Sequence, residues 1–128
     1  MIHLDIQNQK TSFSPGETIA AKITWQLEKS VNAIELRLFW HTNGKGTQDI
    51  NIVNTLRFTQ PPQRDTRPFQ FQLPSSPYSF SGKLISLIWA IEAVTDPLDE
   101  AGRQEFILSP TGREILLCDT FPANPVNG

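Results

Sequence analysis

The side chains of this chain that could transfer protons or bind metals are few and scattered. The 128 residues include two histidines, His3 and His41, and one cysteine, Cys118. The densest group of carboxylates is Asp96-Pro97-Leu98-Asp99-Glu100. Ca²⁺ prefers oxygen ligands of this kind, but the segment lacks the spacing and the glycine of an EF-hand loop. We interpret it as a solvated turn, and both histidines as exposed side chains rather than ligands.

Other catalytic and phosphate-binding motifs are absent from the sequence. Gly44-Lys45-Gly46 is glycine-rich, but it lacks the GxxxxGK[ST] spacing and no predicted helix follows it. Asn43-Gly44 favours a tight hairpin turn instead. A small hydrolase would need Asp96, Asp99 or Glu100 beside a histidine, and the histidines are distant in sequence. We therefore predict that the protein is not an enzyme and has no catalytic, metal or cofactor site.

Charge and composition exclude several classes of partner. The chain has 11 Lys+Arg and 13 Asp+Glu, a net charge of −2, whereas nucleic-acid-binding domains are strongly basic. The densest apolar segment, residues 84–94, is interrupted by Ser86 and Glu92 and is shorter than the ~20 residues of a membrane helix. The N-terminal residues show no targeting signal. We expect no nucleic-acid partner, no membrane insertion and a cytoplasmic location.

The elements that must position any site are short β-strands. Apolar and polar residues alternate with period two, which is typical of strands with one buried face. Breakers such as Ser14-Pro15-Gly16 and Pro61-Pro62 separate these runs. Near Asn54 the alternation is irregular and indicates a β-bulge. The expected strands lie at residues 2–6, 19–27, 34–41, 50–58, 69–73, 84–94, 105–108 and 114–118.

The strand at residues 84–94 is apolar on both faces. Such a strand is either central in its sheet or covered on its second face by a partner. If no element of the chain covers it, one face is a candidate protein-interaction surface. That face is formed by Ile85, Leu87, Trp89 and Ile91. Trp25, Trp40 and Trp89 all lie on apolar stripes and are expected in the core.

Six to eight short strands separated by turns predict an all-β fold. We expect an antiparallel, immunoglobulin-like or arrestin-like β-sandwich of about seven to eight strands over residues 1–118. The proline-containing tail, residues 119–128, is polar and weakly patterned. It is expected to be partly disordered, with docking along the sandwich as the alternative.

Three segments resemble the arrestin-like superfamily. Phe13-Ser14-Pro15-Gly16-Glu17-Thr18-Ile19 resembles the family's "Y-x-PGE-x-V" opening, and Arg67-Pro68-Phe69-Gln70-Phe71-Gln72-Leu73-Pro74 resembles its "FPF-x-F-x-LP" strand. Tyr78-Ser79-Phe80-Ser81-Gly82, before the apolar strand, is similar to its "P-S-Y/F-x-G" turn. The resemblance covers about residues 13–95. Arrestins have two sandwiches and a basic first-strand cluster, both missing here, so phosphate sensing is not carried over.

The resemblance implies a non-enzymatic, protein-binding or scaffolding module of the single-domain, arrestin N-terminal-like type. An exposed sheet edge is a second candidate surface, because it can accept a partner strand or pair two copies into a homodimer. The alternative is a small-ligand or carbohydrate-binding sandwich. Its aromatic platform would have to come from Tyr78, Phe80 and Trp89.

Overall fold

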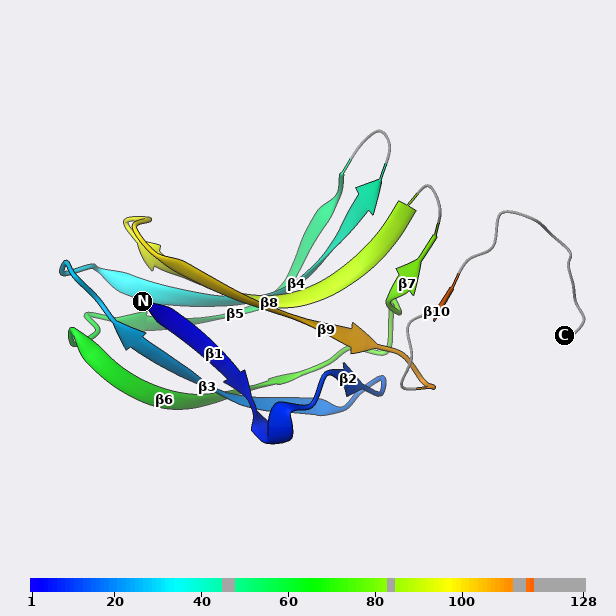
Figure 1. Ribbon diagram of the computed structural model, residues 1–128, viewed down its shortest axis with the longest axis horizontal. Helices are drawn as coiled ribbons and strands as arrows, with labels where there is room; N and C mark the ends of the chain where they lie inside the picture. The colour runs from blue at the N-terminus through cyan, green and yellow to red at the C-terminus, as the bar shows by residue number, and fades with distance from the viewer. Residues whose placement is uncertain (45–47, 83–84, 112–114, 117–128) are drawn as a thin grey trace, which may run out of the picture.

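The alternating segments form two curved sheets that face each other across one core, in a computed structural model that describes residues 1–44, 48–82, 85–111 and 115–116 (Figure 1). The all-β sandwich expected from the sequence is confirmed. A short 3₁₀ turn, η1 (Gln7–Gln9), follows the first strand. The strands in the described residues are β1 (Ile2–Ile6), β2 (Ser12–Phe13), β3 (Thr18–Gln26), β4 (Ala33–Gly44), β5 (Ile50–Thr59), β6 (Arg64–Gln72), β7 (Phe80–Ser81), β8 (Ile85–Asp96), β9 (Ala101–Leu108) and β10 (Ile115–Leu116).

The smaller sheet has the order β1-β3-β6, and all its pairs are antiparallel. Its inner face comes from the alternate residues that the sequence predicts. Ile19, Ile23 and Trp25 of β3 are fully buried, whereas Thr18, Lys22 and Gln26 are exposed. A strand with side chains on alternating faces produces this pattern when one face packs on a core.

The larger sheet is organised around β8. Strand β4 pairs antiparallel with one side of β8 along its whole length, and β7 and then β9 pair with the other side. β5 pairs with the far side of β4, and β10 pairs with β7. The central place of β8 explains why it is apolar on both faces. Figure 1 shows that the β4–β5 hairpin and the start of β8 bend away from the smaller sheet.

Two buried tryptophans occupy the core between the sheets. Trp25 and Trp89 are fully buried, as expected, and Trp40 packs against the core while half-buried. A buried indole needs a hydrogen-bond acceptor for its N–H. Nε1 of Trp25 donates to the Pro62 carbonyl and Nε1 of Trp89 to the Pro77 carbonyl, each at 2.8 Å. The core therefore also fixes the loops before β6 and before β7.

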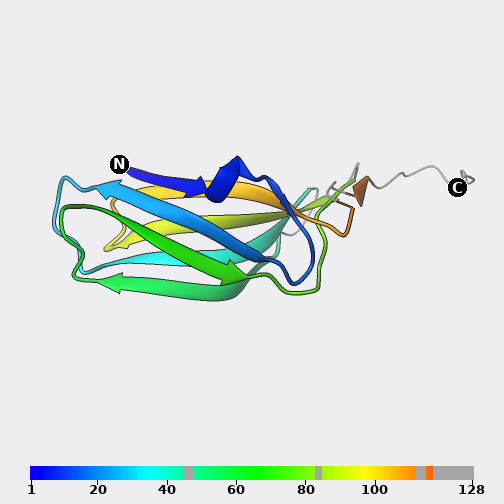
Figure 2. The ribbon, with the colours of Figure 1, turned by 90° about the horizontal axis from the view of Figure 1, so that it is seen from below.

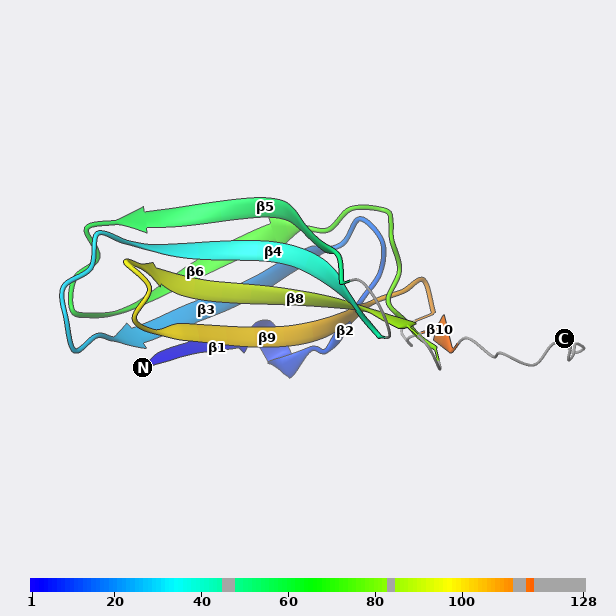
Figure 3. The ribbon, with the colours of Figure 1, turned by 90° about the horizontal axis from the view of Figure 1, so that it is seen from above.

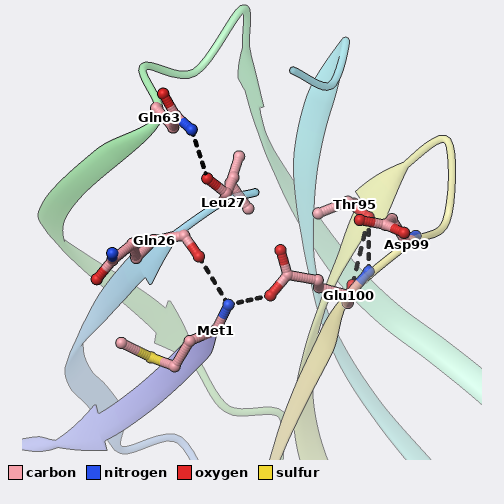
Figure 4. Close-up of polar contacts among 7 residues, drawn as sticks. All are labelled: Met1, Gln26, Leu27, Gln63, Thr95, Asp99 and Glu100. Atoms are coloured by element: carbon pink, nitrogen blue, oxygen red, sulfur yellow. Dashed lines mark hydrogen bonds and ion pairs between the residues drawn. The ribbon is translucent and has the colours of Figure 1, made fainter. Parts of the chain in front are cut away.

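One rim of the sandwich is closed by the close approach of β1 and β9, and we call it the closed rim. A Cβ atom on Gly102 would lie 2.8 Å from the carbonyl oxygen of Ile2, so only glycine allows this approach. Figure 4 shows the amino group of Met1 between two acceptors, the Gln26 carbonyl at 2.7 Å and the Glu100 carboxylate. These contacts link β1, β3 and the start of β9.

The carboxylate-rich turn between β8 and β9 is organised by a buried hydroxyl. Oγ1 of Thr95 accepts hydrogen bonds from the backbone N–H groups of Asp99 (2.8 Å) and Glu100 (3.1 Å) (Figure 4). The same hydroxyl donates to the Pro97 carbonyl at 2.9 Å. The segment 96–100 is thus a turn whose backbone is held by the Thr95 hydroxyl, which agrees with the interpretation of its sequence.

The opposite rim, which we call the open rim, carries β5 and β6. Figures 2 and 3 show these two strands together along one side, with β1 and β9 along the other. Within the described residues, β5 pairs only with β4, and β6 only with β3. Each strand therefore has one side without a strand partner.

One loop prediction is wrong, the bulge prediction is confirmed, and the predictions for the C-terminal segment fall outside the described residues. Asn43-Gly44 does not form the tight turn, because β4 continues through Gly44, which lies opposite Ile85 of β8. The predicted bulge is confirmed: the register of β5 against β4 shifts at Val53. Cys118, the boundary at residue 118 and the tail 119–128 lie outside the described residues.

Candidate protein-interaction edge

The interaction face expected on β8 is wrong for three of its four residues. Leu87, Trp89 and Ile91 are 5%, 0% and 1% exposed, because this face of β8 points at the smaller sheet. Ile85 alone is exposed, at 40%, at the end of β8 that bends away from the core. The smaller sheet therefore covers this face of β8, which the sequence alone did not show.

The exposed aliphatic side chains gather on β5 instead. Ile50, Ile52 and Val53 are 68%, 50% and 39% exposed. Burying aliphatic surface of this kind against a partner is favourable by ~25 cal/mol per Å². We define the β5 edge as the free side of β5 together with these three side chains.

The bulge at Val53 places the two halves of β5 on different faces. Leu56 and Phe58 point inward and pack against the core. Before the bulge, Ile52 lies opposite Phe39 and Ile50 opposite His41, two residues on the outer face of β4. The extra residue therefore turns Ile50 and Ile52 outward, although they share sequence parity with Leu56 and Phe58.

An aromatic cluster on the outer face supports this half of β5. The rings of Phe39 and His41 are stacked with centroids 5.9 Å apart, and the Arg103 guanidinium lies 5.2 Å from the centre of the Phe39 ring. Phe39 is buried under these neighbours although it lies on the outer face. The two isoleucines of β5 thus extend an apolar surface that begins on β4.

Charge and proline protect the other edge of the open rim but not β5. Unpaired strand edges invite pairing with other chains, and natural proteins block them with charges and prolines. β6 carries Arg64, Asp65, Arg67 and Pro68. β5 has no proline and one charged residue, Arg57. The edges of β1 and β9 lie together at the closed rim. Of the two open-rim strands, β5 is therefore the one whose described edge has neither proline nor several charges.

The single charge of β5 is held by carboxylates of the same molecule. The Arg57 guanidinium donates to Asp96 at 2.7 Å and to Glu35 at 3.2 Å, and Arg37 donates to Glu35 at 2.7 Å. The hydrogen bond from Arg37 holds the pKa of Glu35 below its ordinary value; burial acts in the opposite direction, and Arg57 adds to the lowering. The ion-pair cluster neutralises this end of the β5 edge.

His41 and Asp96, two of the residues considered for catalysis, do not come together. His41 lies opposite Ile88, whereas Asp96 lies opposite Ala33 at the other end of β4. His3 is exposed on the smaller sheet, and His41 is half-buried with an Nε2 atom that has no hydrogen-bond partner. In the described part of the chain, no group of three or more His, Cys, Asp or Glu side chains could hold a metal ion.

The aromatic platform of the carbohydrate-binding alternative is not formed, because Trp89 is fully buried. A different hollow, of about 850 Å³, lies on the smaller sheet beside η1. Asn8 and Gln9 of η1 have positive φ angles of 60° and 54°. The polar side chains around this hollow are Asp5, Gln7, Asn8, Gln9, Lys22 and Gln70.

Comparison with known proteins identifies the fold. No protein-family model matches the chain, and no curated protein matches its sequence. Its structure is similar to that of Spo0M, a sporulation control protein from Bacillus subtilis, with a TM-score of 0.59 and 17% sequence identity. The match covers 84% of this chain and 48% of that one, so the chain spans about half of the Spo0M chain. The likeness supports an arrestin-like fold and nothing finer.

None of the described residues forms a helix of the length and hydrophobicity that crossing a membrane requires.

The burial of β8 yields a matched pair of predictions. Leu87→Lys places an ammonium group in the core, which costs several kcal/mol, comparable to the total stability of a domain. Ile85→Lys, two residues away on the exposed end, should change the melting temperature by only a few degrees. Circular dichroism melting curves of both variants test this. A Leu87→Lys protein that melts like the wild type would show that this face is not core.

The ion-pair cluster predicts a specific pH dependence. Because the pKa of Glu35 is lowered in the folded protein, its contribution is present above the unfolded value of ~4.3 and is lost as pH falls further. Glu35→Gln should lower the free energy of unfolding at neutral pH by about 1 kcal/mol or less and flatten its decline between about pH 5 and 3. Urea titrations at several pH values measure both, with Glu28→Gln, an exposed glutamate outside the cluster, as the control. A Glu35→Gln protein with an unchanged pH profile would contradict the prediction.

Proposed function

We propose that the protein is a non-enzymatic binding or scaffolding module that recognises protein through the β5 edge. The observation that carries this proposal is that, among the strands the structure describes, β5 alone combines an edge without a strand partner, three exposed aliphatic side chains and a nearly uncharged sequence. A strand edge offers N–H and C=O groups at regular spacing, so an extended partner segment can add to the sheet. The arrestin-like fold is compatible with such a role, but the proposal does not depend on it.

The geometry of β5 divides recognition into two contributions. Backbone hydrogen bonds along residues 50–59 would supply affinity that is largely independent of sequence. The outward side chains Ile50 and Ile52, beside Phe39, would select apolar side chains at alternate positions of the partner. The partner segment is therefore expected to be extended and to carry apolar residues with period two.

The matched variants Ile52→Lys and Gln72→Lys test the proposal. Each adds one positive charge at an exposed position of an open-rim strand, the first on β5 and the second on β6. A protein recovered with the wild type from source cells is purified and titrated against each variant. Ile52→Lys should weaken binding ~10-fold or more, which corresponds to ~1.4 kcal/mol, and Gln72→Lys should bind like the wild type.

Melting curves of the two variants control for folding. Equal binding by Ile52→Lys and the wild type, with both folded, would place the interface elsewhere and overturn the proposal.

A second candidate function is binding of a small polar ligand in the hollow beside η1. Asp5 and Lys22 lie opposite each other there on β1 and β3, and four carboxamide side chains surround them. Carboxamides both donate and accept hydrogen bonds, so the site suits a ligand rich in hydroxyl or amide groups. The two consecutive residues with positive φ form its wall, and such strained backbone is concentrated at functional sites.

Ala20→Trp fills this hollow from its floor, whereas Thr18→Trp lies on the same face of β3 outside it. A panel of sugars, amino acids and nucleosides is screened by thermal shift. A ligand at about 100 times its Kd stabilises the folded state by ~2.7 kcal/mol, so the melting temperature should rise by several degrees. The rise should vanish in Ala20→Trp and persist in Thr18→Trp. If no ligand shifts the wild type, or if Ala20→Trp responds equally, this candidate fails.

A further inference from the structure

We propose that the strand added at the β5 edge is β5 of a second copy of this chain, paired antiparallel about a two-fold axis at Thr55. The inference rests on the proposed function and names its partner. It follows from three properties of β5: its charge, the faces of its side chains and the position of its bulge.

The first property is that two β5 strands meet without repulsion. The only charged residue in each is Arg57, and Asp96 and Glu35 of the same molecule hold it. By contrast, β6 carries two arginines and an aspartate beside Thr66. Like charges directly opposite each other destabilise a strand pair, so the choice of register must also keep the two Arg57 side chains apart.

The second property is the distribution of side chains between the two faces. Residues directly opposite in an antiparallel pair lie on the same face of the sheet. On β5, the partners on β4 place Ile50, Ile52, Thr55, Arg57 and Thr59 on the outer face. Asn51, Asn54, Leu56 and Phe58 lie on the inner face.

The third property is the extra residue at Val53, which sets the register. With the axis at Thr55, Thr55 of one copy faces Thr55 of the other, and Asn54 faces Leu56. Once Val53 is skipped as the bulge in each strand, Ile52 faces Arg57 and Ile50 faces Thr59. Asn51 then faces Phe58. Every pair lies on one face, and all of β5 except the bulge residue takes part.

Other axes satisfy fewer of these conditions. An axis at Arg57 places two guanidinium groups opposite each other. An axis at Leu56 pairs Ile52 with Thr59 but leaves Ile50 and Asn51 without partners on β5. The Thr55 axis instead sets the exposed Ile52 beside the aliphatic part of Arg57, which can cover it while the charged group stays with Glu35 and Asp96. It also joins the two larger sheets into one continuous sheet.

Sedimentation of the purified full chain tests self-association directly. Between about 1 and 100 µM the wild type should shift from monomer to dimer, and Gln72→Lys should do the same. Ile52→Lys should remain a monomer over this range, with an unchanged melting curve at low concentration. A wild type that stays monomeric, or a dimer that Ile52→Lys leaves intact, overturns the inference.

Cysteine crosslinking tests the register. In a Cys118→Ser background, which leaves no other thiol, Thr55→Cys should form a disulfide-linked dimer under mild oxidation. Directly opposite residues have Cα atoms about 4.5–5.5 Å apart, within the range of a disulfide. Thr59→Cys is the control, because its two copies would lie at opposite ends of the pair, roughly 25 Å apart. Crosslinking that is equal at both positions, or stronger at Thr59, overturns the proposed pairing.

The failure of this inference is distinguishable from that of the proposed function. If the pure protein is monomeric but Ile52→Lys still loses a purified partner, a foreign strand occupies the β5 edge and only the identity of the partner is wrong. If Ile52→Lys affects neither self-association nor partner binding, the β5 edge is not an interface and both proposals fail.

Discussion

Every strand at the edge of a sheet has backbone N–H and C=O groups that need partners, and this requirement shapes the whole molecule. At the closed rim, β1 and β9 approach so closely that Gly102 has no room for a side chain. At the open rim, β6 is protected by its charges and by Pro68. β5 has neither kind of protection. Among the described residues, the outer edge of β5 has no strand partner, and the same strand carries three exposed aliphatic side chains. The two features therefore point to the same surface.

The core and the loops depend on each other through the same need to satisfy buried polar groups. The indole N–H groups of Trp25 and Trp89 have carbonyl acceptors in the loops at Pro62 and Pro77. The buried hydroxyl of Thr95 donates to one backbone group of the turn between β8 and β9 and accepts from another, so this turn is also tied to a buried polar group. Local loop geometry is thus coupled to packing between the sheets. β5 takes part in this packing through its inward half, where the ring centroid of Phe58 lies 5.9 Å from that of Trp25.

The sequence predicted the sandwich and most of its strands, because period-two alternation is a local property of residues such as Ile19 to Trp25. It did not reveal which apolar faces are covered. Leu87, Trp89 and Ile91 resembled a surface because their cover, the smaller sheet, comes from segments far away in sequence. Conversely, Ile50 and Ile52 share parity with Leu56 and Phe58, so alternation alone does not show that they lie on the other face. The irregularity near Asn54 was visible, but the residue that bulges and the half that turns outward depend on pairing with β4.

The closed rim has a consequence for how the chain folds during synthesis. Ile2 and Gly102 lie about 100 residues apart in sequence, so β1 can pair with β3 early but meets β9 only after nearly the whole described chain has left the ribosome. Until then the nascent sandwich is open along the edge of β1 as well as along the open rim. Sheets built from such distant segments fold slowly, and slow folding prolongs the exposure of unpaired strands. The hydrogen bond from Met1 to the Gln26 carbonyl can form with the early β1–β3 pair. The contact of Met1 with the Glu100 carboxylate can form only once the turn between β8 and β9 is in place.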